Sequence, residues 1–364
     1  MTTQQRHHDS DVLVLGAGYA GLMAALSLAP HARVTLVDPA GHFTERVRLH
    51  ERAAGHPAPV HPLSTLLRGT GVRHLAARAT RIDPAAREVH TDDGRILSYD
   101  RLVHALGSRT AAVSGDRTYT TETAAELHKR LGEAPGSLAV VGGGLTGIEL
   151  AAELAESHPF QRVSLLTGGT VGPGLSARGR AHVRTVLTAR GVRIEEGHRV
   201  TDPGAVDADT VVWAAAMVPT TGLATAAGLA VDATGRIEVD AALRSVSHPE
   251  IYAAGDSAAA HTPAAGHLRM ACATALPTGT HAAASIAAEL RGEEPEPLRF
   301  GYRMQCVSLG RHDGLIQPVR ADDSPRDLVF TGRAAARAKE EVLRSTLRLL
   351  RVAAHHPTAA RLVL

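Results

Sequence analysis

The chain of 364 residues is poor in lysine, cysteine and aromatic side chains, and each shortage excludes something. Lys129 and Lys339 are its only lysines, so arginine carries nearly all the positive charge, and we attribute this together with the abundance of alanine to genomic composition. Basic residues number 39 and acidic residues 37, for a formal charge of +2. This balance gives no reason to expect nucleic acid as a partner.

The two cysteines, Cys272 and Cys306, are 34 positions apart, and no C-x-x-C motif occurs. A close-spaced redox dithiol is therefore excluded. The main interpretation is a small buried residue at each position, and a functional pair is the alternative. The 21 histidines are scattered without the spacing of metal ligands, so we expect no metal site.

Long apolar runs are also missing, although hydrophobic residues make up 44% of the chain. No segment of 18 or more apolar residues occurs, so we expect no membrane-spanning helix. Residues 1–10 are polar and lack the apolar segment of a signal peptide, which predicts a protein of the reducing cytoplasm. The length favours two domains and an appendage.

The most informative motif follows the first apolar run, residues 11–15, which is typical of a buried parallel strand. Gly16-Ala17-Gly18-Tyr19-Ala20-Gly21 comes next and leads into a helical Ala/Leu-rich segment. In such a loop the first glycine makes the turn, the second lets a pyrophosphate approach, and the third lets helix and strand pack. A second strand, 33–37, ends in Asp38, which is placed to accept from both ribose hydroxyls of an adenosine.

The same unit recurs 126 positions later, where residues 138–141 lead into Gly142-Gly143-Gly144-Leu145-Thr146-Gly147. This internal duplication predicts two dinucleotides, or two halves of one dinucleotide site. The strand after it, 162–166, ends in Thr167 instead of an acid. Without that carboxylate a 2′-phosphate is not repelled, so NADPH is permitted beside NADH, and Arg178 downstream is a candidate partner for the phosphate.

With these loops, Val103-His-Ala-Leu-Gly-Ser-Arg109 and Ile251-Tyr-Ala-Ala-Gly-Asp-Ser257 make the chain resemble the two-dinucleotide-binding-domain flavoproteins of the pyridine nucleotide-disulfide oxidoreductase superfamily. Type II NADH dehydrogenases and apoptosis-inducing-factor-like reductases are the nearest in pattern. The resemblance implies an α/β fold of two Rossmann-like dinucleotide-binding domains, with the NAD(P) domain inserted in the FAD domain and a small α+β region at the C-terminus. The implied boundaries are 1–110 with 245–299 for FAD, 111–244 for NAD(P), and 300–364 for the C-terminal region.

Carried over residue by residue, the resemblance implies that Gly107 marks the crossing between the domains and that Asp256 binds the ribityl or pyrophosphate end of FAD. Ala79 would meet adenine through its backbone. Arg46 would lie over the pyrophosphate or flavin, with a surface ion pair as the alternative. The full set of expected cofactor-binding residues is Gly16, Gly18, Tyr19, Ala20, Gly21, Asp38, Pro39, Arg46, Ala79, Ala105, Gly107, Gly142, Gly144, Gly147, Gly255, Asp256, Pro277 and Thr278.

Three residues are expected beside the reacting rings: Glu149, Pro277 and Thr278. Glu149 would orient the nicotinamide carboxamide, although an acid in a first helical turn is also favoured by the helix dipole. We predict that Pro277 begins a helix, because proline suits the first helical position. The N–H groups of Thr278 and Gly279 would then face the flavin, and an ordinary kinked helix is the alternative.

The resemblance fails at this same segment. Type II dehydrogenases carry paired glutamines here, whereas this chain has Cys272, Ala273 and Leu276. Ala216 also stands where the family usually has glycine. These departures argue against quinone as the electron acceptor.

The tail predicts short strands near residues 304–309 and 315–319 and a helix over 334–354. Leu343, Leu347 and Leu350 form one stripe of that helix, with arginines beside it. A docked helix with a solvated arginine face, or a homodimer contact, is favoured over peripheral attachment to a membrane surface.

The function that these expectations favour is an enzyme in which NADH or NADPH reduces FAD by hydride transfer. The reduced flavin would pass electrons to a small acceptor: a quinone-like compound, dioxygen or an intermediate of specialised metabolism. One alternative is a redox-sensing binding protein of the apoptosis-inducing-factor type. Another is a flavin-dependent substrate oxidase whose NAD(P) domain is vestigial.

Overall fold

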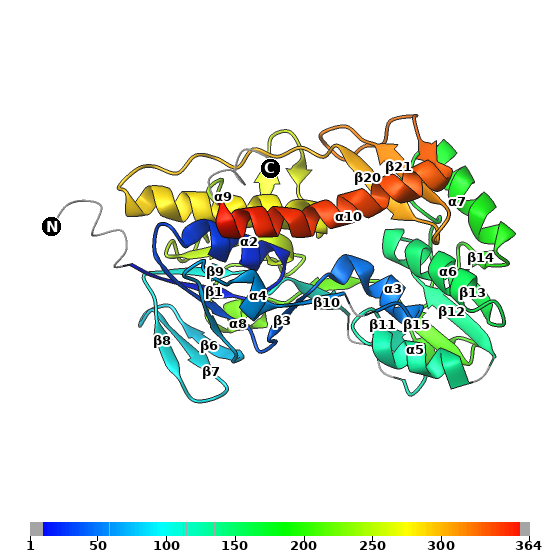
Figure 1. Ribbon diagram of the computed structural model, residues 1–364, viewed down its shortest axis with the longest axis horizontal. Helices are drawn as coiled ribbons and strands as arrows, with labels where there is room; N and C mark the ends of the chain where they lie inside the picture. Colours follow the sequence, from blue (N-terminus) through cyan, green and yellow to red (C-terminus); the bar gives the residue numbers. More distant parts are fainter. Residues whose placement is uncertain (1–9, 58, 112, 114, 134, 357–364) are drawn as a thin grey trace.

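The computed structural model describes residues 10–57, 59–111, 113, 115–133 and 135–356. Two parallel five-stranded sheets form two α/β units that lie along the long axis of the molecule (Figure 1). The predicted α/β class with Rossmann-like units is confirmed. The first sheet has the order β17 (Ile251–Ala253), β9 (Arg101–His104), β1 (Asp11–Leu15), β2 (Arg33–Val37) and β5 (Arg73–Leu75).

The second sheet repeats this arrangement within one continuous stretch of chain. Its order is β11 (Thr118–Thr120), β15 (Thr210–Trp213), β12 (Ser137–Val141), β13 (Arg162–Leu166) and β14 (Arg193–Glu195). Around it lie α5 (Ala124–Glu133), α6 (Leu145–Ser157), α7 (Ala177–Ala189) and the short η2 (Pro203–Ala205). In both sheets the glycine loop follows the central strand, which places each loop where the strand order reverses.

Smaller elements decorate the first unit. An antiparallel sheet of three strands contains β6 (Ala79–Asp83), β7 (Glu88–Thr91) and β8 (Ile96–Ser98). The excursion after β2 contains β3 (His42–Thr44), η1 (Arg46–Arg48), α3 (Leu49–Ala53), β4 (Val60–Pro62) and α4 (Leu63–Leu66). The remaining elements are α8 (Gly222–Ala226), η3 (Gly255–Ser257), β18 (His261–Thr262) and β19 (Gly266–His267).

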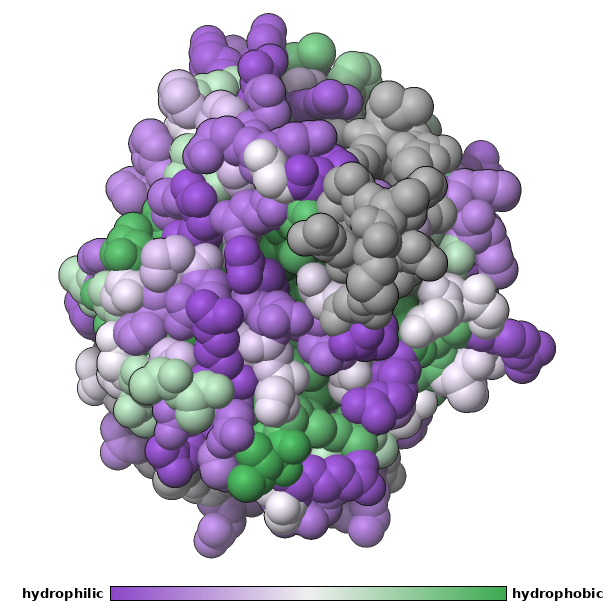
Figure 2. Space-filling model, turned by 90° about the vertical axis from the view of Figure 1, so that its left-hand side faces the viewer, coloured by the Kyte–Doolittle hydropathy of each residue, from purple (hydrophilic) through white to green (hydrophobic). Residues whose placement is uncertain are grey.

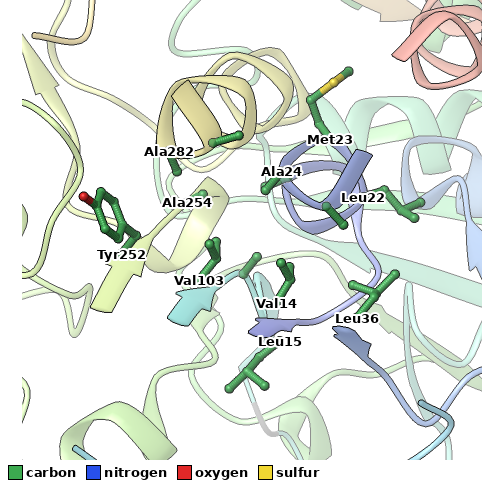
Figure 3. Packing of buried hydrophobic residues seen from close by; sticks show 14 of the residues in the cluster. Val14, Leu15, Leu22, Met23, Ala24, Leu36, Val103, Tyr252, Ala254 and Ala282 are labelled. Atoms are coloured by element: carbon green, nitrogen blue, oxygen red, sulfur yellow. The ribbon is translucent and has the colours of Figure 1, made fainter. Parts of the chain in front are cut away.

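The core of the first unit is built around α2 (Tyr19–Leu28), whose ten residues are all buried. It lies between the sheet and α9 (Cys272–Leu290), so it carries apolar side chains on every side, as a fully enclosed helix must. Figure 3 shows Val14 of β1, Leu22 and Ala24 of α2, and Ala282 of α9 pointing into this core. Each fully buried aliphatic side chain of this kind contributes roughly 1.5–3 kcal/mol.

The backbones of α2 and α9 approach each other most closely at Gly279. A Cβ atom at this position would lie 2.3 Å from the carbonyl oxygen of Ala20. The carbonyl belongs to the backbone of α2, which is itself enclosed by the sheet and α9. Neither helix can therefore move apart without a loss of packing. Gly279 therefore sets the spacing of the two helices.

We expect Gly279→Ala to lower the free energy of unfolding by about 1–3 kcal/mol, the usual cost of overpacking a core. Chemical denaturation followed by circular dichroism measures the effect. The matched control is Gly132→Ala in α5, where an added Cβ meets nothing within 4 Å. Equal midpoints for the two variants would show that the helix contact is not tight.

The chain passes between the two units through a two-stranded ribbon. β10 (Ser108–Thr110) leaves the first unit and pairs antiparallel with β16 (Met217–Pro219), which returns to it. After the return, Ala224, Leu229, Ile237 and Leu243 are buried in the core of the first unit. We therefore propose that the inserted unit ends at β16, before the predicted boundary at residue 244.

The C-terminal region contains the antiparallel strands β20 (Met304–Ser308), β21 (Gly314–Pro318) and β22 (Phe330–Thr331), followed by α10 (Gly332–His355). The predicted strands and helix of the tail are confirmed. α10 begins against β21 and then runs along α2 and past α4, so it crosses from one unit to the other (Figure 1). Leu343 and Leu350 are buried, and Leu347 packs against the same core, which matches the docked alternative.

Within the described ranges, none of the helices combines the length and the apolar composition that a membrane span requires. Figure 2 shows the end of the molecule that carries the first unit. Hydrophilic residues cover most of that face, and hydrophobic ones gather in separate groups.

Candidate functional site

The two glycine loops have the same geometry, residue for residue. Gly16 has φ +99° and Gly142 has φ +127°, conformations that other residues rarely adopt. A Cβ at Gly21 would lie 1.8 Å from the carbonyl oxygen of Gly16, and a Cβ at Gly147 equally close to that of Gly142. The outer glycines are therefore needed for the turn and for helix packing.

The middle glycines, Gly18 and Gly144, differ from the outer ones. A Cβ built on either meets no atom within 4 Å, so open space lies in front of each. Each is the N-cap of its helix without a side-chain capping bond, and no acid lies in either first turn. Two uncapped helix N-termini that face open space are suited to bind two anionic pyrophosphates.

Asp38 lies next to the first loop, and its expected bonds to the adenosine ribose stay a prediction. Its Oδ2 accepts from the backbone N–H of Ala17 at 2.7 Å, and Oδ1 accepts from that of Ala40 at 2.8 Å. These bonds orient the carboxylate at the end of β2, with Pro39 between them. The backbone carbonyl of Asp38 also contacts Nε2 of His74 at 3.0 Å.

A second acidic side chain, Asp256, approaches from the returning segment. Ser108 donates its hydroxyl to Oδ2 of Asp256 at 2.6 Å. Oδ1 is buried and has no hydrogen-bond partner within the described part of the chain. Asp256 thus has an acceptor available for a hydroxyl of a bound ligand, which fits the ribityl chain or ribose of FAD.

The first unit brings the other expected residues of the FAD site together. The backbone N–H of Gly255 donates to the Thr278 hydroxyl at 2.9 Å. The Cβ of Ala20 would meet an added Cβ at Gly255 at 2.9 Å, and Ala105 lies beside Gly16. Ala79 begins β6, in the small antiparallel sheet, and it packs against the same core.

Two expected positions are corrected by the structure. Helix α9 begins at Cys272, and Pro277 lies inside it instead of at its start. The N–H groups left free by the helix geometry are those of Cys272 and Ala273. Thr278 is buried and donates its hydroxyl to the carbonyl of Thr274 at 2.7 Å, so it stabilises the helix around the proline.

Arg46 is the second correction. Its guanidinium pairs with Glu122 of the inserted unit at 2.8 Å, which is the ion-pair alternative. Burial of Glu122 would raise the pKa of its carboxyl, but hydrogen bonds with Thr110 and the charge of Arg46 lower it to about 2. The pair therefore remains charged at neutral pH and links the two units.

Glu149 is buried and faces the C-terminal region. Its Oε1 lies 2.9 Å from Nζ of Lys339 on α10 and accepts from the backbone N–H of Ser308 at 3.0 Å. Burial disfavours both charges, but the ion pair lowers the pKa of Glu149 and raises that of Lys339. Sequence reasoning missed Lys339, although its rarity in an arginine-rich chain was a signal.

The two cysteines lie on either side of this pair. Lys339 donates to the carbonyl of Cys306 at 3.2 Å. Its positive charge also acts on Cys272 at the start of α9, where it favours the lower pKa of the thiol. Burial raises the pKa of the Cys272 thiol to about 12 and also raises that of Cys306. Both are free thiols that remain protonated at neutral pH, and they are half-buried, not fully buried as the main interpretation expected.

His104, in the motif that the resemblance used, is fully buried at the end of β9. Burial lowers its pKa to about 4, so the ring is neutral under ordinary conditions. A core histidine of this kind has a packing role.

The end of β13 carries a feature that the sequence did not reveal. Arg199 lies against Gly168, where an added Cβ would be 3.1 Å from the arginine Cβ. Arg199 is exposed and makes no ion pair with the described residues. A 2′-phosphate of NADPH would be held at this end of the strand.

Replacing Lys339 by methionine should lower the free energy of unfolding by about 3–5 kcal/mol, because Glu149 would be left buried without its partner. The double variant Glu149→Gln/Lys339→Met should recover part of the loss. Denaturant midpoints at pH 7 measure both. If Lys339→Met matches the unsubstituted protein, the pair is not buried as described.

The same pair predicts a pH dependence. The folded pKa of Glu149 is lowered, so the stability it contributes is present above the ordinary glutamate pKa of about 4.3 and is lost as the pH falls through the lower folded value. Glu149→Gln should therefore lose less stability than the unsubstituted protein between pH 6 and pH 3.5. Identical slopes of stability against pH would contradict the assignment.

Taken together, two uncapped glycine loops, the carboxylates of Asp38 and Asp256, and a ribbon between two parallel sheets define a two-nucleotide flavoprotein oxidoreductase. The chain belongs to the pyridine nucleotide-disulphide oxidoreductase family, whose model matches residues 10–284. It is an oxidoreductase that uses FAD and NAD(P)H.

Relatives and solved structures agree with this assignment. The chain is 32% identical to an NADH dehydrogenase-like protein of Mycobacterium tuberculosis, over 91% of this chain and 92% of the relative. It is 30% identical to the type II NADH:quinone oxidoreductase of Staphylococcus haemolyticus, over 84% of this chain and 88% of the relative. The sulfide:quinone oxidoreductase of Aquifex aeolicus has the same fold, with a TM-score of 0.74, 19% identity, and coverage of 95% and 92%.

Proposed function

We propose that this protein transfers electrons from NADH or NADPH, through FAD, to a small apolar acceptor of the quinone type. The observation that carries the proposal is an apolar cavity of about 750 Å³ that reaches the first turn of α9. This volume is within the range of small-molecule sites in proteins. The relatives named for quinone reduction support the same class of acceptor.

The cavity lies between α9, α10 and the segment that leads into β20. Ala273 is exposed at one side and Val342 of α10 at another, while Phe300 and Tyr302 supply aromatic walls. The complete lining is Thr262, Pro263, Ala264, Ala273, Leu298, Arg299, Phe300, Gly301, Tyr302, Arg303, Met304 and Val342. A flat apolar ring fits such walls better than a charged acceptor does.

The departures from the family pattern take on a physical meaning here. Ala273 leaves space where a glutamine side chain would project. Because Pro277 has no N–H, the carbonyl of Ala273 lacks its helical donor. That carbonyl is available to accept from an O–H of the reduced quinol product, a role that does not require the missing glutamines.

When bound, FAD would supply the redox chemistry, namely hydride acceptance from the nicotinamide and transfer of two electrons to the acceptor. The residues of the chain bind and orient. The uncapped N-terminus of α9 directs positive potential towards the flavin site. Lys339, with Glu149, places a buried charge pair between the inserted unit and this helix.

The test is an anaerobic titration of the FAD-loaded protein with NADH and NADPH, followed by addition of menadione. We expect bleaching of the flavin absorbance and its recovery on menadione addition. Absence of bleaching would overturn the proposal in favour of a substrate oxidase. Bleaching with turnover below about 1 s⁻¹ on every acceptor would favour a redox-sensing protein.

Filling the cavity should separate the two half-reactions. Ala273→Phe is expected to lower kcat/KM for menadione at least tenfold, while bleaching of the flavin by NADH stays unchanged. Stopped-flow absorbance measures the two separately. Ala338→Phe, on an exposed part of α10 outside the lining, is the matched control, and equal losses in the two variants would remove the cavity from the path.

Arg199 supports the use of NADPH beside NADH. A charge-assisted hydrogen bond to a phosphate contributes about 1.5–3 kcal/mol, or roughly ten- to hundredfold in affinity. Arg199→Ala should therefore raise the Kd for NADP⁺ by that factor and leave the Kd for NAD⁺ unchanged. Arg178→Ala tests the residue that the sequence favoured, and a loss confined to that variant would reassign the phosphate to it.

A further inference from the structure

A second cavity, of about 690 Å³, lies beside α10, on the flank opposite Val342. Residues of η1 and α3, the turn between β20 and β21, and the first three turns of α10 surround it. We propose that this cavity is a binding site for a small organic anion that carries phosphate or carboxylate groups. Neither glycine loop contributes to its lining, so it is distinct from the two sites expected to hold pyrophosphate.

The lining is dominated by positive charge. Three acidic side chains, Glu51, Glu340 and Glu341, face it together with the cations Arg48, Arg311, Arg333, Arg337, Lys339 and Arg344 and the ring of His312. Glu149 and Glu153, which pair with Lys339 and Arg311, lie just behind and offset part of this charge.

Every carboxylate in the lining is already paired. Arg48 meets Glu340 through two parallel bonds, with Nη1 to Oε2 at 2.9 Å and Nη2 to Oε1 at 3.0 Å, and it also contacts Glu51. Glu341 pairs with Arg344 and Arg348. The carboxylates of the lining are therefore engaged in ion pairs with neighbouring arginines.

Two arginines remain without a partner. Arg333 and Arg337 are one helical turn apart on α10, both line the cavity, and neither makes an ion pair with the described residues. Like charges at this spacing repel each other. An anion between them would remove the repulsion, and two guanidinium groups can bind phosphate or carboxylate oxygens in bidentate fashion.

The floor of the cavity connects it to the redox site. Lys339 lines the cavity and its Nζ pairs with Glu149, so a bound anion would lie next to that pair. Arg311 on the opposite wall pairs with Glu153 of α6 at 2.7 Å. The ligand would therefore contact residues from the first unit, the C-terminal region and, through these pairs, the inserted unit.

The test uses protein loaded with FAD in the presence of saturating NAD⁺, so that both glycine loops are filled. Isothermal titration calorimetry with pyrophosphate and, separately, with citrate measures binding to the remaining site. We expect saturable 1:1 binding of at least one probe, weakened by added salt. Arg333→Ala/Arg337→Ala should weaken it at least about tenfold.

Arg351→Ala is the matched control, because Arg351 is exposed on α10 outside the cavity. The affinity of this variant for pyrophosphate and for citrate should equal that of the unsubstituted protein. Tighter binding of pyrophosphate would show that the natural ligand is a phosphate compound, and tighter binding of citrate that it is a carboxylate. No saturable heat from either probe, or equal affinity in the double variant, overturns the proposal. Because binding is measured without turnover, this result is independent of whether the acceptor is a quinone.

Discussion

The structure depends on one kind of contact, in which the backbone of a helix packs directly against the backbone of a loop or of another helix. Only glycine allows this contact, because a Cβ atom would collide with the opposing carbonyl oxygen. It occurs where Gly21 meets the carbonyl of Gly16, where Gly147 meets that of Gly142, and where Gly279 meets Ala20. The first two contacts place helix N-termini directly in front of the central strands, with their N–H groups uncapped. The third holds α9 against α2, so that the start of α9 lies beside Asp256 and the flavin site.

The C-terminal helix is the second organising element. α10 buries its leucine stripe against α2, and its first turns carry Lys339 to Glu149 and Glu340 to Arg48. Because these partners lie on the inserted unit and on the first unit, one helix ties the two together. The same helix separates an apolar cavity from a cationic one, so its two flanks present different chemistry. The proposed apolar acceptor and the proposed anion would therefore bind on opposite flanks of α10.

The two departures from the type II dehydrogenase pattern lie apart: Ala216 precedes β16 with φ +56°, and the other lies at the start of α9. The segment that lacks glutamines is the first turn of α9, and it borders the apolar cavity through Ala273. In that turn the chain has the small Ala273 and a carbonyl that Pro277 leaves without a helical donor, and Lys339 is buried near Cys272. The thiols of Cys272 and Cys306 remain protonated beside it and add no redox couple of their own.

The sequence by itself determined the two glycine loops, their strands, Asp38 and the returning Gly-Asp segment, because each is a local pattern whose residues follow one another in the chain. It also predicted the strands and helix of the tail.

Only the tertiary structure decided the rest, since it depends on residues far apart in sequence. The start of α9 at Cys272 reflects packing that overrides the preference of proline for a first turn. The partners Lys339 for Glu149, Glu122 for Arg46 and Ser108 for Asp256 come from distant segments, and both cavities are lined by such segments together with α10. These distant partners keep the buried groups charged although burial opposes their charges, and no local pattern of residues encodes such pairing.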